Sequence, residues 1–312
     1  MPFLAIPFPR IDPILFQFGP FDLGPISLGP FAIRWYALAY ISGLVLGWWY
    51  MNRLLRTDRL WPALASGNKS AGKVNTPATK LDIDDLIIWL MLGVIVGGRL
   101  GYVVFYQPSI ITSNPLGIFA VWQGGMSFHG GTLGVVIAAI LFSWRRKLNF
   151  LRVGDLIAAA TPFGLFFGRT ANFINGELWG KVTLAPWGMV FPTGGFMPRH
   201  PSQLYEAALE GVVLFIVLRI ATHRFLSFHR PGLTIGLFAT GYGVARILVE
   251  FFRQPDAHIG YLTGGVVTMG MVLSLPMVLV GGVLIWRASD KAPDWLKFGP
   301  LSNNRKAQGQ KR

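Results

Sequence analysis

Seven long apolar stretches alternate with polar or basic links along the chain. Each holds roughly the 20 residues that a helix needs to cross about 30 Å of hydrocarbon. The pattern therefore predicts an all-α integral membrane protein with about seven transmembrane helices, which together occupy residues 31–286. In the third stretch, the glycines of residues 124–131 indicate a broken entry, with the helix proper beginning near Thr132. The expected helices cover residues 31–51, 83–106, 118–144, 155–174, 203–221, 232–252 and 262–286.

Four segments depart from this pattern. Residues 1–30 contain three Gly-Pro pairs, which break helix and strand alike, so we expect an irregular segment on one membrane face. Residues 57–80 and 176–202 are expected to be loops, because the first is rich in Ser, Gly, Asn and Lys and the second is rich in Gly and Pro. The basic residues 287–312 form a polar tail with too few apolar side chains to fold.

Positive charge is divided unequally between the two membrane faces. The links after the first, third, fifth and seventh stretches hold 19 Lys and Arg residues, whereas the links on the other face hold four. Cytoplasmic loops carry the excess of Lys and Arg, so we expect the N-terminus outside and the C-terminus in the cytoplasm. Only 13% of the residues are charged, whereas soluble domains are about a quarter charged. The net charge of +14 therefore indicates loops that face anionic lipid rather than a nucleic-acid-binding surface.

This topology brings polar residues from several helices to one depth, near the outer interface. Arg169 and Arg246 lie in separate spans, each near a glutamate, and guanidinium groups in hydrocarbon are costly unless they bind a partner. The planar guanidinium fork fits phosphate, so we expect a phospholipid headgroup there. The arginines would stabilise a departing phosphate ester, and His129 or a glutamate could accept a proton from the nucleophile. Arg99, late in the second span, is expected at the same depth.

Simpler roles remain open for several of these residues. Glu250 lies one turn after Arg246 and could form an intrahelical ion pair with it. Asn172 and Asn175 could bond helices to one another. His129 could be a structural histidine between glycine-rich turns.

Five motifs carry a resemblance to a known family. The longest, Gly-Arg-Thr-Ala-Asn-Phe-Ile-Asn-Gly-Glu-Leu-Trp-Gly, occupies residues 168–180. The other four are Arg34-Trp35-Tyr36, the Gly-Gly-Met-Ser-Phe-His-Gly-Gly of 124–131, the His-Pro-Ser-Gln-Leu-Tyr-Glu of 200–206, and the Tyr-Gly-Val-Ala-Arg of 242–246 followed by Glu250 and Arg253. In order and spacing, from about residue 25 to 287, the chain resembles the prolipoprotein diacylglyceryl transferases of bacterial inner membranes. Ala171 stands where the family usually has glycine, a change between small residues.

The resemblance implies a reaction, a topology and a set of site residues. The family transfers the diacylglyceryl group of phosphatidylglycerol to the lipobox cysteine thiol of a prolipoprotein, which forms a thioether and releases glycerol 1-phosphate. Its members have seven transmembrane helices, with the active site toward the periplasm. By position, Arg169 would bind the phosphate, Arg246 would be essential beside it, and His129 corresponds to the histidine proposed as the base. The other residues lining the phosphatidylglycerol site would be Tyr36, Asn172, Glu177, Tyr242 and Glu250.

The expected partners are phosphatidylglycerol and the signal peptide of a prolipoprotein, whereas no metal, cofactor or nucleic acid is implied. The chain contains no cysteine, which agrees with a thiol supplied by the substrate. The main alternative is a membrane lipid or anion transporter, but the inverted repeats typical of transporters are not evident. A phospholipid-using transferase that acts on sugar or peptidoglycan would normally need an acidic pair or a metal site.

Overall fold

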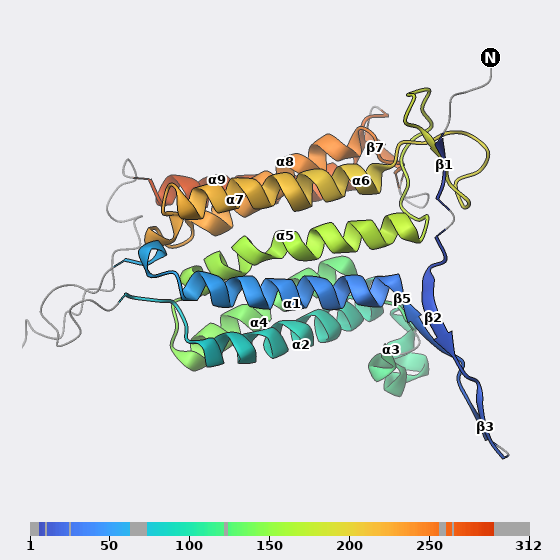
Figure 1. Cartoon of the computed structure of the whole chain (residues 1–312), viewed down its shortest axis with the longest axis horizontal. Helices are drawn as coiled ribbons and strands as arrows, with labels where there is room; N and C mark the ends of the chain where they lie inside the picture. The colour runs from blue at the N-terminus through green and yellow to red at the C-terminus, as the bar shows by residue number, and fades with distance from the viewer. Residues whose placement is uncertain are drawn as a thin grey trace, which may run out of the picture.

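The computed structural model describes residues 6–9, 11–24, 26–62, 74–121, 124–255, 260–263 and 265–289, and most of these are helical (Figure 1). The long helices lie side by side along one direction, and most of the short strands gather beyond one end of the bundle. One helical stretch continues from α6 (Ser202–Glu206) through the π-helical η4 (Ala207–Val213) into α7 (Leu214–His223). The other long helices are α1 (Trp35–Leu55), α2 (Lys80–Phe105), α4 (Phe128–Arg146), α5 (Phe150–Ile174), α8 (Leu233–Glu250) and α9 (Met269–Arg287).

Four of the described helices, α2, α5, α8 and α9, are long and apolar enough to cross a membrane. The longest of them, α2, has 26 residues, which corresponds to about 39 Å at 1.5 Å per residue. Helix α1 is also long, with 21 residues, but its sequence is rich in Trp and Tyr, which favour membrane interfaces. The chain is therefore a mostly helical, multi-pass membrane protein.

The helices pack in pairs: α2 lies mainly against α4, α8 against α9, and α1 against α5. Glycines permit the close approach of α2 and α4. A methyl group added at Gly93 would lie 2.6 Å from the carbonyl oxygen of Gly134, and one added at Gly101 would lie 2.7 Å from the Cα of Gly130. Small residues of this kind let membrane helices come into backbone contact. Helices α2 and α4 therefore form one tightly packed unit.

The largest apolar core lies at the end of the bundle opposite the strands. It joins Leu54 at the end of α1, Leu86 near the start of α2 and Phe142 near the end of α4, all of which are almost fully buried. Trp61 stacks on Phe228, with 4.6 Å between the ring centroids. This core fixes the helices at one end and leaves the other end to polar side chains.

The expectation of an irregular amino-terminal segment is wrong for its described residues, because they pair as strands. β2 pairs antiparallel with β5, β3 pairs antiparallel with β4, and β1 runs parallel to β6. Gly19 lies between β2 and β3 and Gly29 between β4 and β5, with φ angles of 84° and 101° that glycine adopts readily. Their Gly-Pro pairs therefore separate the β2–β5 pair from the β3–β4 pair. The strands are β1 (Ile6–Pro7), β2 (Ile14–Phe18), β3 (Phe21–Leu23), β4 (Ile26–Leu28), β5 (Phe31–Arg34) and β6 (Met189–Val190).

Helix α4 begins earlier than expected. Its first residue is Phe128, not Thr132, because the Ser127 hydroxyl caps the helix by accepting a hydrogen bond from the Gly130 N–H at 3.2 Å. The expected break at residues 124–131 is thus shorter, because Phe128 to Gly131 already belong to α4. Before it lie α3 (Ser109–Ser113) and the 3₁₀ helix η2 (Pro115–Phe119).

Two helices, by contrast, begin later than expected. Helix α1 begins at Trp35 because β5 occupies the four residues before it. Helix α9 begins at Met269 because β7 (Tyr261–Thr263) and β8 (Val267–Thr268) form an antiparallel pair before it. Residues 63–73 of the expected cytoplasmic loop and residues 290–312 of the expected tail lie outside the described residues.

Candidate functional site

A buried group of ion pairs, here called the arginine–glutamate network, joins α5, α6, η4 and α8. It lies toward the strand end of the bundle, where α5 ends and α6 begins (Figure 1). Three positive and three negative side chains balance one another, which satisfies the requirement that charges in a low-dielectric interior be paired. The members are Arg169, Glu206, Glu210, Arg246, Glu250 and Arg253.

Glu206 is the centre of the network. Its Oε2 lies 2.8 Å from Nε of Arg169, and its Oε1 accepts hydrogen bonds from Nη1 of Arg246 at 2.9 Å and from Nη1 of Arg253 at 3.1 Å. The Arg169 contact is short, but its angle does not make a hydrogen bond, so it acts as an ion pair alone. One carboxylate, only 1% exposed, therefore fixes the guanidinium groups of α5 and α8 relative to each other.

Each of the other two glutamates contacts one of the arginines held by Glu206. Glu210, in η4, accepts hydrogen bonds at Oε2 from Nε and Nη2 of Arg169, both at 3.4 Å. Glu250 lies 2.5 Å from Nη2 of Arg246 and accepts a hydrogen bond from the Thr268 hydroxyl at 2.7 Å. Isolated π-helical turns such as η4 occur frequently at functional sites.

The network presents arginine rather than glutamate at its surface. The side chains of the three glutamates are 0–4% exposed, whereas those of the arginines are 11–15% exposed. Each guanidinium carries five N–H donors, and the described contacts of Arg169 involve Nε and Nη2 but not Nη1. The arrangement is therefore suited to binding an anion at its rim while the glutamates hold the arginines in place.

A second polar group lies one turn farther along α5. Asn172 donates hydrogen bonds to Oε1 of Glu177 at 2.8 Å and to the Tyr36 hydroxyl at 3.5 Å. Asn175 also donates to Glu177, at 3.4 Å, and Gln203 donates to the Glu177 carbonyl at 2.5 Å. These bonds tie the start of α1 and the start of α6 to the end of α5.

The loop of residues 176–202 contributes a histidine beside this group. The His200 Nδ1 and the Tyr205 hydroxyl are 3.0 Å apart, and Trp187 donates a hydrogen bond to the same hydroxyl at 2.7 Å. Burial, with a smaller contribution from the positive charge of Lys181, lowers the pKa of His200 below its usual value. A neutral His200 that accepts a hydrogen bond from Tyr205 fits this geometry.

The structure brings together most of the residues expected from sequence. Arg169, Arg246 and Glu250 belong to the network, so the intrahelical pair of Arg246 and Glu250 exists but is only one part of a larger set. Tyr36, Asn172 and Glu177 form the second group. The expected lining residue Tyr242 is buried one turn before Arg246 and packs beside Leu214 and Leu218.

His129 lies on a helix that contributes no side chain to the network described above. It occupies the exposed side of the first turn of α4, and α4 packs mainly against α2. The ion pairs described above therefore do not bear on its expected role as the base, which stays a prediction.

Arg99, which was expected at the same depth as the other polar residues, contacts none of the network's side chains among the hydrogen bonds and ion pairs described for it. Its guanidinium donates hydrogen bonds to backbone carbonyls of Gly117, Ile118 and Gly124, at 2.5 Å, 3.0 Å and 2.5 Å. Its charge is thus satisfied by the segment that precedes α4, and it anchors that segment to α2.

Three members of the network were missed as functional residues by sequence reasoning: Glu206, Glu210 and Arg253. Glu206 and Arg253 belong to two of the five family motifs, but the sequence alone did not indicate a role for either. Glu206 and Glu210 are four residues apart in an otherwise apolar helix, where carboxylates are costly unless paired. That spacing was the signal that could have identified them.

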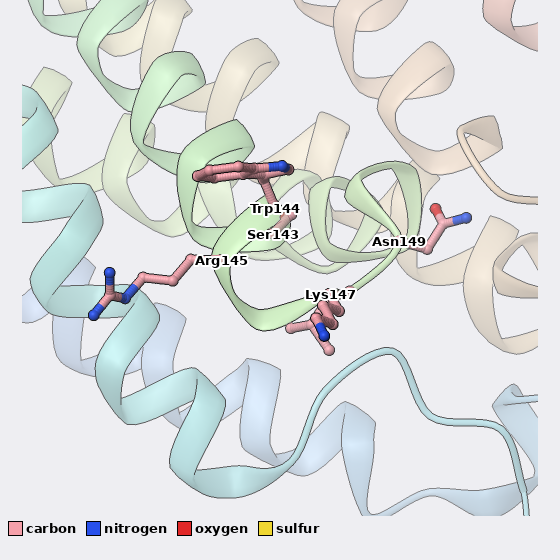
Figure 2. Close-up of a pocket in the computed structure, with 6 residues that line it drawn as sticks. Ser143, Trp144, Arg145, Lys147 and Asn149 are labelled. Atoms are coloured by element: carbon pink, nitrogen blue, oxygen red, sulfur yellow. The ribbon is translucent and has the colours of Figure 1, made fainter.

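A cavity of about 770 Å³ lies at the other end of the bundle, at the turn between α4 and α5. Figure 2 shows that the labelled side chains of Trp144, Arg145 and Asn149 point in different directions from this turn. Side chains that diverge in this way do not form a convergent binding site. The lining residues are Ser143, Trp144, Arg145, Lys147, Leu148 and Asn149.

Comparison with known proteins agrees with the motifs. The family model "Prolipoprotein diacylglyceryl transferase" matches residues 25–287. The chain is similar to proteins named phosphatidylglycerol–prolipoprotein diacylglyceryl transferase from three bacteria. It is 51% identical to the one from Brucella anthropi over 94% of this chain and 97% of the relative. It is 50% identical to the relative from Agrobacterium fabrum, over 91% of this chain and 95% of the relative. It is 49% identical to the relative from Allorhizobium ampelinum, over 92% of this chain and 93% of the relative.

Proposed function

Because the chain belongs to the prolipoprotein diacylglyceryl transferase family, we propose that it transfers the diacylglyceryl group of phosphatidylglycerol to the lipobox cysteine of a prolipoprotein. The observation that carries the proposal is the joining of Arg169 and Arg246, from separate helices, through the single carboxylate of Glu206. Two guanidinium groups held in this way form a cradle for one phosphate.

The chemistry follows from that cradle. The substrate thiol loses its proton, and the resulting thiolate attacks the carbon that bears the phosphate ester. A carbon–sulfur bond forms, the carbon–oxygen bond to phosphate breaks, and glycerol 1-phosphate leaves with the bonding electron pair. Arg169 and Arg246 stabilise the negative charge that develops on the departing phosphate. Since the arginines are already held by Glu206, Glu210 and Glu250, little reorganisation is needed.

His129 is the proposed acceptor of the thiol proton. Histidine is the side chain that most often acts as a general base in enzymes. The remaining proposed residues, Tyr36, Asn172, Glu177, Tyr242 and Glu250, shape the phosphatidylglycerol site around the arginines. Their hydrogen bonds to one another, such as that between Asn172 and Glu177, support a preorganised wall rather than a direct chemical role.

We further propose seven transmembrane helices, with the N-terminus in the periplasm, the C-terminus in the cytoplasm and the site toward the periplasmic face of the inner membrane. In addition to the four strongly apolar helices, the proposal counts α1, α4 and the continuous stretch of residues 202–223, which run alongside them (Figure 1). The excess of Lys and Arg in the links at the opposite end supports this orientation.

The function is tested with the purified full chain, phosphatidylglycerol and a lipobox peptide. The peptide should gain the mass of one diacylglyceryl group, and glycerol 1-phosphate should appear in equal amount. A peptide with serine in place of the cysteine is the matched control and should gain no mass. If the cysteine peptide also remains unmodified, the transferase proposal fails.

The alternative of a lipid or anion transporter has no support from the relatives, which are named transferases. The same purified protein, reconstituted in vesicles, distinguishes a transporter from a transferase. A transporter would move phosphatidylglycerol or anions across vesicle membranes without forming a thioether.

A further inference from the structure

A basic pocket lies at the end of the bundle far from the arginine–glutamate network. It has a volume of about 460 Å³ and is formed by α7 and by the 3₁₀ helix η1 (Asp58–Leu60), which follows α1. Glu206 and His223 lie 17 residues apart in one continuous helical stretch, so the two sites are separated by about 25 Å. The pocket is lined by Arg59, Ile216, Arg219, Ile220, His223 and Arg224.

The part of α7 that lines the pocket carries both apolar and basic side chains. Ile216, Arg219, Ile220 and His223 share one helix face, because residues three and four apart lie above one another. The two isoleucines are each 49% exposed and alternate with the basic residues, since Ile216 precedes Arg219 and Ile220 precedes His223. Exposed apolar side chains beside basic ones match a phospholipid, which combines acyl chains with a charged headgroup.

Arg219 is held in place by neutral groups. Its Nη1 donates hydrogen bonds to Nε2 of His223 at 3.1 Å and to the Tyr50 hydroxyl at 3.4 Å. Because Nε2 of His223 accepts, the imidazole proton is on Nδ1, which lies 2.9 Å from the Thr222 hydroxyl. The Thr222 hydroxyl in turn donates to the Arg219 carbonyl at 3.1 Å. These contacts orient the guanidinium without neutralising its charge.

The arginines of the pocket are not paired with carboxylates. Within the described part of the chain, Arg59 donates to the carbonyl of His223 at 3.5 Å, and neither Arg219 nor Arg224 forms an ion pair with Asp or Glu. At the same end of the bundle, Arg146 pairs with Asp82 and Asp85. Carboxylates therefore pair with arginine elsewhere at this end of the bundle, but not in this pocket. The positive charge of the pocket is left for an external anion.

We propose that this pocket binds the headgroup of an anionic phospholipid of the cytoplasmic leaflet, at a site distinct from the substrate site. The phosphate would contact Arg219 and Arg224, and an acyl chain would lie along Ile216 and Ile220. Basic pockets between helices on the cytoplasmic side are a recurrent form of lipid headgroup recognition. The neutral His223 and Tyr50 preserve the geometry of Arg219 when the lipid is absent.

The test uses the full chain in phosphatidylcholine nanodiscs that contain a small fraction of phosphatidylglycerol with a photoreactive acyl chain. After irradiation, mass spectrometry maps the labelled peptides, so labelling near α7 is separated from labelling near Arg169. We expect α7 to be labelled in the unmodified protein, and the labelling to fall about 30-fold in the double variant Arg219→Gln, Arg224→Gln. Photoreactive phosphatidylcholine should label α7 weakly in both proteins.

The matched control is the double variant Arg145→Gln, Lys147→Gln, which removes the same charge at the same end from the turn whose side chains diverge (Figure 2). Its α7 labelling should stay within about twofold of the unmodified protein. An equal loss in this control, or no loss in the Arg219 and Arg224 variant, would overturn the proposal. So would displacement of the lipid by millimolar inorganic phosphate, which would identify a free-anion site.

Folding of the variants is checked independently of the lipid. Transferase activity in detergent should persist, because neither arginine belongs to the network at the other end. If the double variant does not insert, Arg224→Gln alone serves, since Arg224 is exposed and the contacts of Arg219 stay intact. This single variant should lose about fivefold of the α7 labelling, and an unchanged level would contradict the proposal.

Discussion

Two arginines in different helices of the bundle, Arg99 and Arg169, have different kinds of partner. Arg99 of α2 is 4% exposed and donates its hydrogen bonds to backbone carbonyls of the segment before α4. Arg169 of α5 is paired with two carboxylates, Glu206 and Glu210. When backbone carbonyls accept the N–H groups of an arginine, those groups are no longer free to bind a ligand. When a carboxylate pairs with the guanidinium, the remaining N–H groups can still bind a second anion. The hydrogen-bond partners of an arginine, and not its burial, therefore show whether it can belong to an anion site.

The same difference separates two parts of the molecule. The α2–α4 part is built on glycine contacts and on Arg99, whereas the α5–α8 part is built on ion pairs. If the interpretation is right, substitutions at Arg99 and at the glycine contacts change stability, and substitutions in the α5–α8 part change the transfer reaction. His129, in α4, is the one residue of the first part that is proposed to act in the chemistry.

The largest effect is expected for Arg169→Ala. Loss of one donor that stabilises developing charge costs about 100- to 1,000-fold in rate, so transfer to the lipobox peptide should fall by that factor. Arg169→Lys keeps the charge but loses the planar fork, and should still lose at least about 10-fold. Activity is measured by peptide mass gain, and the melting temperature in detergent verifies folding. An alanine variant that is folded and keeps more than a tenth of the activity would remove Arg169 from the mechanism.

His129→Gln asks whether the α2–α4 part contributes to the chemistry. Loss of a general base costs about 100-fold or more, so the rate should fall by that factor. The rate is measured at several pH values with saturating phosphatidylglycerol. Near-normal activity at every pH would reject His129 as the base, and the α2–α4 part would then be structural throughout.

Much of the fold could be predicted from the sequence, because it depends on local composition. The apolar stretches located the long helices to within a few residues at most ends, and the motif of residues 168–180 identified Arg169 as a site residue. The starts of α1 and α9 were expected too early because short strand pairs precede them. A strand pair depends on a partner elsewhere in the chain, and the apolar residues of β5 resemble the beginning of a helix.

The network could be predicted only in part, because its partners are brought together by helix packing. That Arg169 and Arg246 share one site follows from the topology. That both contact Glu206 depends on how α6 packs against α5 and α8, which no periodicity reveals. For Arg99 the sequence likewise indicated only its place along α2, whereas its carbonyl partners, such as Gly117 and Gly124, belong to the segment that precedes α4.

Arg99→Gln should act on stability rather than on chemistry. The change leaves backbone carbonyls near Gly117 and Gly124 without their charged donor, and unsatisfied buried groups of this kind cost about 1–3 kcal/mol each. The melting temperature in detergent should therefore fall by several degrees, while the rate per folded molecule stays within about threefold. Arg145→Gln, at an exposed position, is the control and should leave both quantities unchanged. A large loss of rate at an unchanged melting temperature would mean that Arg99 belongs functionally with Arg169.

The smallest loss of rate among the network substitutions is expected for Gly270→Ala in α9, where Gly270 lies against Glu250. A methyl group at this position would collide with the carboxylate of Glu250, which is held by the Thr268 hydroxyl and is paired with Arg246. The carboxylate must shift, and Arg246 with it, so the turnover rate should fall about 10-fold while the protein stays folded. Gly282→Ala lies in the same helix, where an added methyl group meets no neighbour within 4 Å, and should keep full activity. If the two variants are equally active, Glu250 does not position Arg246, and the glutamates behind the arginines balance charge without setting geometry.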